Sequence, residues 1–194
     1  LCINDKKIDY ANGESLIDKT GTCNDIVSIE YTPDECFSVD STGAIVNYQC
    51  VAANGYNLPV ITNVVIPKKI NNIAITSISG GTFNNKQLTS VIIPNTVTSI
   101  GQTAFYRNQL TNVVIPDSVT SIGQGAFREN RINSITLSNK LINLENFVFY
   151  KNSLNRVTIP ASVTSIGTYV FSDNALINVT IKGDCNRFDS LFGT

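Results

Sequence analysis

The chain has 194 residues, of which 42% are hydrophobic and 15% are charged, and its formal net charge at pH 7 is -1. These values exclude intrinsic disorder and a collagen-like fibre. The balanced charge offers no basic field to a phosphate backbone, so we expect no nucleic-acid partner. No stretch approaches the roughly 20 apolar residues of a transmembrane helix, and the absence of histidine excludes histidine-based catalytic triads and metal sites.

The N-terminal region, residues 1–36, has weak hydrophobic periodicity and is expected to form a small cap, or a linker to an anchor or stem that precedes it. Four of the five cysteines lie within the first 50 residues, and small irregular segments of this kind often need disulfides. We therefore expect two disulfides here and an extracellular location. The candidates are Cys2, Cys23, Cys36, Cys50 and Cys185. Their pairing stays open, and the alternative is that they are reduced, buried cysteines of a cytosolic protein. No C-x-x-C pair is present, so neither a zinc site nor thiol exchange is expected.

The rest of the sequence repeats itself with a period of 22 residues, which indicates a solenoid. The rows read LTSVIIPNTVTSIGQTAF from Leu88, LTNVVIPDSVTSIGQGAF from Leu110, INSITLSNKLINLENFVF from Ile132, LNRVTIPASVTSIGTYVF from Leu154 and LINVTI from Leu176. In each row apolar and polar residues alternate over a short run, so we expect one short parallel strand per repeat.

Two columns of the repeat predict its interior. The first is an aromatic spine of Phe83, Phe105, Phe127, Phe149 and Phe171. The second is a ladder of inward asparagines that satisfies backbone groups of neighbouring coils, formed by Asn108, Asn130, Asn152 and Asn174. Five extra residues between Pro67 and Ile78 predict a protruding loop.

The motif VVIPDSVTSIGQGAF resembles the BspA-like leucine-rich repeat of bacterial and some protist surface proteins. The resemblance covers residues 37–192, because FSVDSTGAIVNY is similar to the usual strand-turn-strand lead-in and IKGDCNRFDSLF to the usual ending. It implies a curved leucine-rich-repeat solenoid of the α/β horseshoe class, mostly β with short helical turns, without shared catalytic residues or a cofactor. The solenoid domain is expected over 37–194, with repeats at about 60–83, 88–105, 110–127, 132–149, 154–171 and 176–192.

One candidate binding surface is the outward face of the predicted strands. Its residues are Val65, Ile92, Val114, Thr136, Arg156 and Thr158. An apolar stripe there gives way to threonines, with a single charge, which suits a flat protein or glycan partner. The alternative is that these β-branched residues are simply good strand formers on a solvated sheet.

A second candidate surface consists of Tyr106, Arg128 and Tyr150, which occupy equivalent places in three successive coils. Coils about 5 Å apart would place the guanidinium between two rings, within the roughly 6 Å reach of cation–π attraction. This ladder either stabilises the solenoid or belongs to a partner site.

These patterns favour a secreted or surface-anchored recognition and adhesion module that is not an enzyme and binds a host or bacterial surface protein or glycan. No metal site is expected. The alternative is a structural subunit that self-assembles, such as the globular head of a pilin-like or fibre protein.

Overall fold

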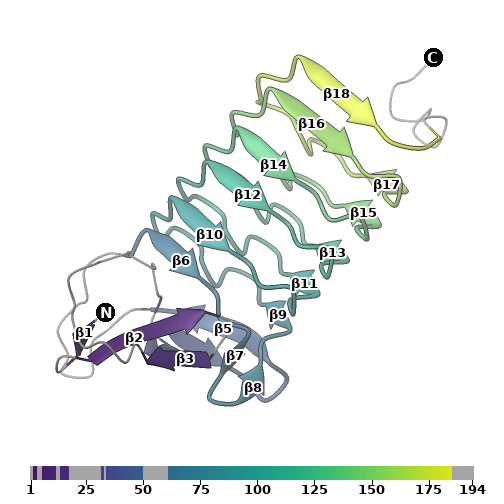
Figure 1. Ribbon diagram of the computed structural model, residues 1–194. Helices are drawn as coiled ribbons and strands as arrows, with labels where there is room; N and C mark the ends of the chain where they lie inside the picture. The colour runs from purple at the N-terminus through teal and green to yellow at the C-terminus, as the bar shows by residue number, and fades with distance from the viewer. Residues whose placement is uncertain are drawn as a thin grey trace.

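The computed structural model describes residues 2–3, 6–11, 14–17, 32, 34–49 and 61–184. Antiparallel strands near the N-terminus are followed in the chain by a β-solenoid of about five coils (Figure 1). The predicted solenoid and its 22-residue period are confirmed. Residues 185–192 of the sixth predicted repeat lie outside the described residues. The division into a cap over 1–36 and a solenoid over 37–194 stays a prediction.

The N-terminal strands are β1 (Cys2–Ile3), β2 (Lys6–Ala11) and β3 (Glu14–Ile17), which form one antiparallel sheet in the order β1-β2-β3. The 3₁₀ turn η1 (Asp34–Cys36) then leads into a hairpin of β4 (Phe37–Val39) and β5 (Ala44–Tyr48). Strand β5 pairs in parallel with β9 (Ser77–Ile78), so the hairpin joins the first coil and extends its sheet. The lead-in predicted from FSVDSTGAIVNY is therefore present.

Two walls of parallel strands run the length of the solenoid. The long-strand wall contains β6 (Asn63–Val65), β10 (Ser90–Ile92), β12 (Asn112–Val114), β14 (Ser134–Thr136), β16 (Arg156–Ile159) and β18 (Asn178–Ile181). The short-strand wall contains β9, β11 (Ser99–Ile100), β13 (Ser121–Ile122), β15 (Asn143–Leu144) and β17 (Ser165–Ile166). From β10 onward the coils repeat every 22 residues, as in Asn112 opposite Ser134. Strands β6 and β10 pair 27 residues apart, as in Asn63 opposite Ser90, because five extra residues lie between them.

The five extra residues form a hairpin of β7 (Lys69–Ile70) and β8 (Ile73–Ala74). Its turn residues Asn71 and Asn72 have φ angles of 50° and 63°. Asparagine tolerates this left-handed region better than most residues, and two such residues in succession suit a tight hairpin turn. The predicted protruding loop is confirmed, and it is a hairpin.

The short helical turns that the resemblance implies are absent from the described residues, which contain no α-helix. That prediction is therefore wrong for this part of the chain. At the corner after β11, the Phe105 N–H donates to the Ala126 carbonyl of the next coil at 2.8 Å, whereas the Tyr106 N–H donates to the Thr103 carbonyl at 3.1 Å. Alternate amides thus bond along the solenoid axis. The φ angle of 53° at both Thr103 and Arg107 also interrupts any helical path.

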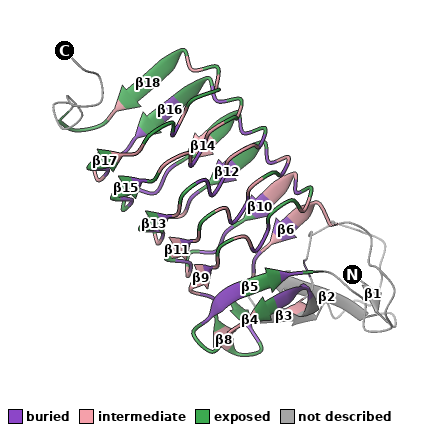
Figure 2. Ribbon diagram, turned by 180° about the vertical axis from the view of Figure 1, so that it is seen from behind, coloured by how far each residue is buried: buried purple, intermediate pink, exposed green. Residues whose placement is uncertain are grey.

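The core is filled by the predicted phenylalanine spine. Successive ring centroids from Phe83 to Phe171 lie 5.0, 5.1, 5.7 and 5.7 Å apart, with interplanar angles of 4° to 12°. The first four rings are completely inaccessible to solvent. Figure 2 shows buried residues along the coils from β6 to β17, whereas β18 at the C-terminal end is mostly exposed.

The predicted asparagine ladder is confirmed, and it connects each coil to the one before it. The Asn130 side-chain amide donates to the carbonyls of Phe105 at 2.9 Å and Phe127 at 3.1 Å. Its Oδ1 accepts the Leu110 N–H at 3.1 Å. Asn108, Asn152 and Asn174 make the equivalent bonds. Buried backbone groups at the corners therefore have partners.

Cys36 is buried and takes part in a disulfide. No complete disulfide lies within the described residues, because Cys23, Cys50 and Cys185 and the side chain of Cys2 fall outside them. The pairing of the five cysteines, which the sequence leaves open, therefore stays open.

Candidate functional site

The outward face of the long-strand wall carries the first predicted surface. Ile92 of β10 is 60% exposed and Val114 of β12 is 56% exposed, and Val65 of β6 lies opposite Ile92 in the parallel register. Thr136 lies opposite Val114 in the same way, while Arg156 and Thr158 are exposed on β16. The residues predicted for this face thus share one sheet surface, with the apolar side chains at its N-terminal end.

The second predicted cluster is also brought together. The Arg128 guanidinium carbon lies 5.4 Å from the Tyr106 ring centroid and 5.2 Å from the Tyr150 ring centroid. Both distances fall within the range of cation–π attraction, so the predicted ladder is present. It follows the phenylalanine corner in three successive coils.

Glu129 connects this ladder to the neighbouring coil. Its carboxylate accepts the Arg107 Nε–H at 2.9 Å and the Arg128 Nη2–H at 2.9 Å. The hydrogen bond from Arg107 and then that from Arg128 hold the pKa of the Glu129 carboxyl below its ordinary value, although partial burial acts in the opposite direction. The same bond raises the pKa of Arg107. Glu129 is therefore ionised at neutral pH.

Sequence reasoning missed two aromatic residues beside this ladder. The rings of Phe147 and Tyr169 stack with centroids 5.3 Å apart and an interplanar angle of 12°. Phe147 also meets the Tyr150 ring edge to face at 5.6 Å, and the Arg128 guanidinium lies 5.8 Å from its centroid. Tyr169 is 61% exposed.

The signal that marks these two residues is a column of the repeat. Its members all have positive φ angles, and they are Gly81, Thr103, Gly125, Phe147 and Tyr169. Two coils have glycine at this position, because glycine adopts a left-handed backbone conformation without steric cost. Two aromatic residues in a column that contains glycine could have been recognised from the 22-residue alignment.

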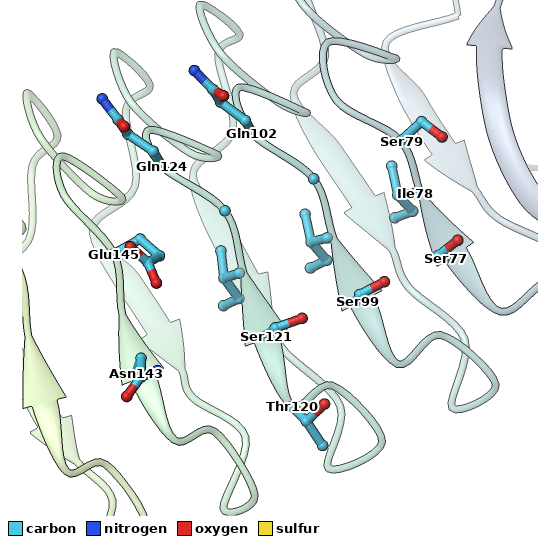
Figure 3. Close-up of a pocket in the computed structure, with 14 residues that line it drawn as sticks. Ser77, Ile78, Ser79, Ser99, Gln102, Thr120, Ser121, Gln124, Asn143 and Glu145 are labelled. Carbon is cyan, nitrogen blue, oxygen red and sulfur yellow. The ribbon is translucent and has the colours of Figure 1, made fainter.

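A groove of about 540 Å³, lined by both polar residues and isoleucines, runs over the short-strand wall (Figure 3). Hydroxyl groups of Ser77, Ser99 and Ser121 border it on successive strands. Its glycines are places of close backbone approach, because a Cβ atom on Gly101 would overlap the backbone nitrogen of Gly80 in the preceding coil. Glu145 is the one carboxylate among the described residues that line it.

Metal-binding and membrane-spanning features were sought in the described part of the chain. No group of three or more cysteine, aspartate or glutamate side chains that could hold a metal ion occurs there. No helix in that part is long and apolar enough to cross a membrane.

The repeat geometry agrees with a known family, the BspA type leucine rich repeat region (6 copies), whose profile matches residues 76–192. The chain belongs to this family. The BspA type match covers the column residues that form the spine and the asparagine ladder. No curated protein sequence matches the chain.

Solved structures of bacterial leucine-rich repeat proteins show the same fold. The T. pallidum leucine rich repeat protein is 25% identical, with a TM-score of 0.66, over 77% of this chain and 71% of that protein. A leucine-rich repeat protein from Eubacterium ventriosum is 26% identical, with a TM-score of 0.56, over 80% of this chain and 41% of that protein. The pneumococcal vaccine antigen PcpA also shares the fold. It is 21% identical, with a TM-score of 0.57, over 72% of this chain and 34% of that protein.

Proposed function

We propose that this BspA type chain is a non-catalytic recognition and adhesion module that acts outside the cell, either secreted or at the cell surface. The disulfide at Cys36 supports an oxidising compartment, because such bonds persist mainly in exported proteins. The partner is a component of a host or bacterial surface.

The observation that carries this proposal is the apolar strip on the long-strand wall. Ile92 and Val114 expose more than half of their surface, although the same strands bury Val91 and Val113 completely or nearly so. Apolar side chains exposed side by side on a rigid sheet favour association with a flat protein surface, since burying them there removes apolar area from water. The strand backbone is already ordered, so binding would cost little ordering entropy.

The test is binding of the purified chain to an array of matrix proteins, glycans and bacterial surface polymers. Ile92→Thr and Val114→Thr place on these strands the residue found at Thr136, so both variants should fold. Ile142→Thr is the matched control, because Ile142 is 52% exposed on the short-strand wall, where other coils carry Thr98, Thr120 and Thr164.

We expect a partner whose affinity falls by about tenfold in Ile92→Thr and Val114→Thr and is unchanged in Ile142→Thr. Equal binding by all three variants, or no binding by the folded chain, would contradict the proposal. Concentration-dependent growth of particle mass in light scattering without any partner would instead support the assembly-subunit alternative.

A further inference from the structure

The corners that follow β11, β13, β15 and β17 lie side by side along the solenoid and carry a cluster that we call the aromatic edge (Figure 1). It consists of Tyr106, Arg128, Phe147, Tyr150 and Tyr169. We propose that the aromatic edge binds an acidic polysaccharide, with successive sugar units lying along successive coils. The inference rests on the proposed recognition function, to which it adds a second surface and a ligand class.

The aromatic residues at this edge are not required by the fold. Phe105, Phe127 and Phe149 already fill the core, and Phe147 and Tyr169 lie outside that spine. Their φ angles of 61° and 57° place bulky side chains in a conformation that glycine adopts at the same column in Gly125. The corners of this fold place other non-glycine residues in this region, such as Thr103 in the same column, but bulky side chains are uncommon there and the two rings therefore call for a role of their own.

The rings form a surface suited to sugars. Phe147 and Tyr169 stack on one another, and Tyr150 meets Phe147 edge to face, so rings in two orientations lie together. The negative π-face of an aromatic ring attracts positively polarised C–H groups, which a pyranose ring presents on its face. Tyr169, with 61% of its surface exposed, offers the most accessible ring.

The charges around the rings select an anionic ligand. Arg107 lies 4.9 Å from the Tyr106 ring centroid, and the Lys151 ammonium lies 5.4 Å from the Tyr150 ring centroid. With Arg128 they make three cations in contact with the rings, against the single carboxylate of Glu129 there. Arg107 and Arg128 share the Glu129 carboxylate, so this ion-paired group carries one positive charge in excess. Carboxylate or sulfate groups of a polysaccharide match this excess.

The spacing of the coils favours a polysaccharide over a peptide. Successive coils are 5.0 to 5.7 Å apart along the phenylalanine spine, which is comparable to the length of one sugar unit in an extended chain. An extended peptide repeats its side-chain direction every two residues, about 6.6 Å, and therefore loses register with this ladder after a few coils.

The experiment measures binding of eight-sugar fragments of hyaluronan and heparin to the intact chain by isothermal titration calorimetry. A neutral malto-oligosaccharide and a poly-glutamate peptide of equal length serve as comparison ligands. Phe147→Gly and Tyr169→Thr introduce the residue types that the same column has at Gly125 and Thr103, so both variants should fold. Thermal denaturation checks that they do. Arg128→Gln removes the central charge.

We expect at least one acidic fragment to bind and the neutral fragment and poly-glutamate to bind about tenfold more weakly or not at all. Phe147→Gly, Tyr169→Thr and Arg128→Gln should each weaken binding by about fivefold to tenfold. Binding of neither acidic fragment, binding that survives both ring substitutions, or equal binding of poly-glutamate would each overturn the inference.

Ile92→Thr separates this inference from the proposed function, because it alters the long-strand wall and leaves the aromatic edge intact. It should bind the protein partner about tenfold more weakly while binding the acidic fragment as the unmodified chain does. A protein partner without glycan binding would overturn the polysaccharide site alone, whereas glycan binding without any effect of Ile92→Thr on a protein partner would overturn the strand-face proposal alone.

Discussion

Two neighbouring coils, residues 110–130 and 132–152, share the phenylalanine and asparagine columns of their interior and differ in their exteriors. Phe127 and Phe149 are equally inaccessible and stack at 5.7 Å. On the outside, Glu145 replaces the glycine at Gly123, and Phe147 replaces the glycine at Gly125. The inward columns keep the two coils in register, since the Phe127 N–H still donates to the Val148 carbonyl at 3.0 Å. The outward change coincides with a break in strand pairing, because β13 and β15 belong to separate sheets.

The second coil also tolerates one change in its interior. Ser138 stands where the preceding coil has Pro116, and it is completely buried. Its hydroxyl donates to the Val119 carbonyl at 2.6 Å and accepts the Lys140 N–H at 3.1 Å. A buried polar side chain is accepted here because its hydrogen-bonding groups have partners.

The largest expected effect is on the shared spine. Phe127→Ala and Phe149→Ala should each lower the free energy of unfolding by about 3 to 5 kcal/mol, because each removes a ring from a closely packed stack and leaves a cavity. Urea denaturation measures the loss, with the exposed Ile142→Thr as the control. An unchanged midpoint in either coil would show that the two interiors are not equivalent.

The asparagine ladder offers a smaller and unequal effect. Asn130→Ala should cost about 2 to 3 kcal/mol, because the Leu110 N–H and two carbonyls lose their partner in a buried site. Asn152→Ala should cost less, since Asn152 is only half-buried and water can replace part of its bonding. Equal losses in urea denaturation would contradict this ranking.

The smallest effect concerns the charge of Glu129, which connects coil 110–130 to the coil before it through Arg107. The folded pKa of Glu129 lies below its ordinary value of 4.5, so its stabilising contribution is present above pH 4.5 and is lost as pH falls through the folded pKa. Glu129→Gln should cost less than about 1 kcal/mol at pH 7 and should reduce the fall in stability below pH 4.5.

Thermal denaturation between pH 3 and 7 measures this difference. Asp40 and Asp117 also have lowered pKa values, mainly through hydrogen bonds from Thr42 and Asn139, so the variant should retain part of the acid sensitivity. Parallel pH profiles for the variant and the unmodified chain would exclude a role for Glu129.

The sequence predicts those features that recur in the repeat. The spine, the asparagine ladder and the ring–Arg128–ring arrangement all depend on residues spaced by one coil, so a fixed period is enough to place them together. The prediction of helical turns was wrong because hydrogen bonds to the neighbouring coil determine the backbone conformation at the corners. The helix propensity of the local sequence carries no information about these bonds. The column that contains Phe147 and Tyr169 is visible in the 22-residue alignment, but its left-handed backbone and the contact of Phe147 with Arg128 appear only in three dimensions.

The alternating amides at the corners have a mechanical consequence. The N–H groups of Thr103, Phe105 and Arg107 all donate to the following coil, so these bonds lie parallel to the solenoid axis. A pulling force on one end of the solenoid would therefore load the outermost coil first and peel the coils away in succession. We expect single-molecule extension to show a series of steps of equal length instead of one cooperative rupture.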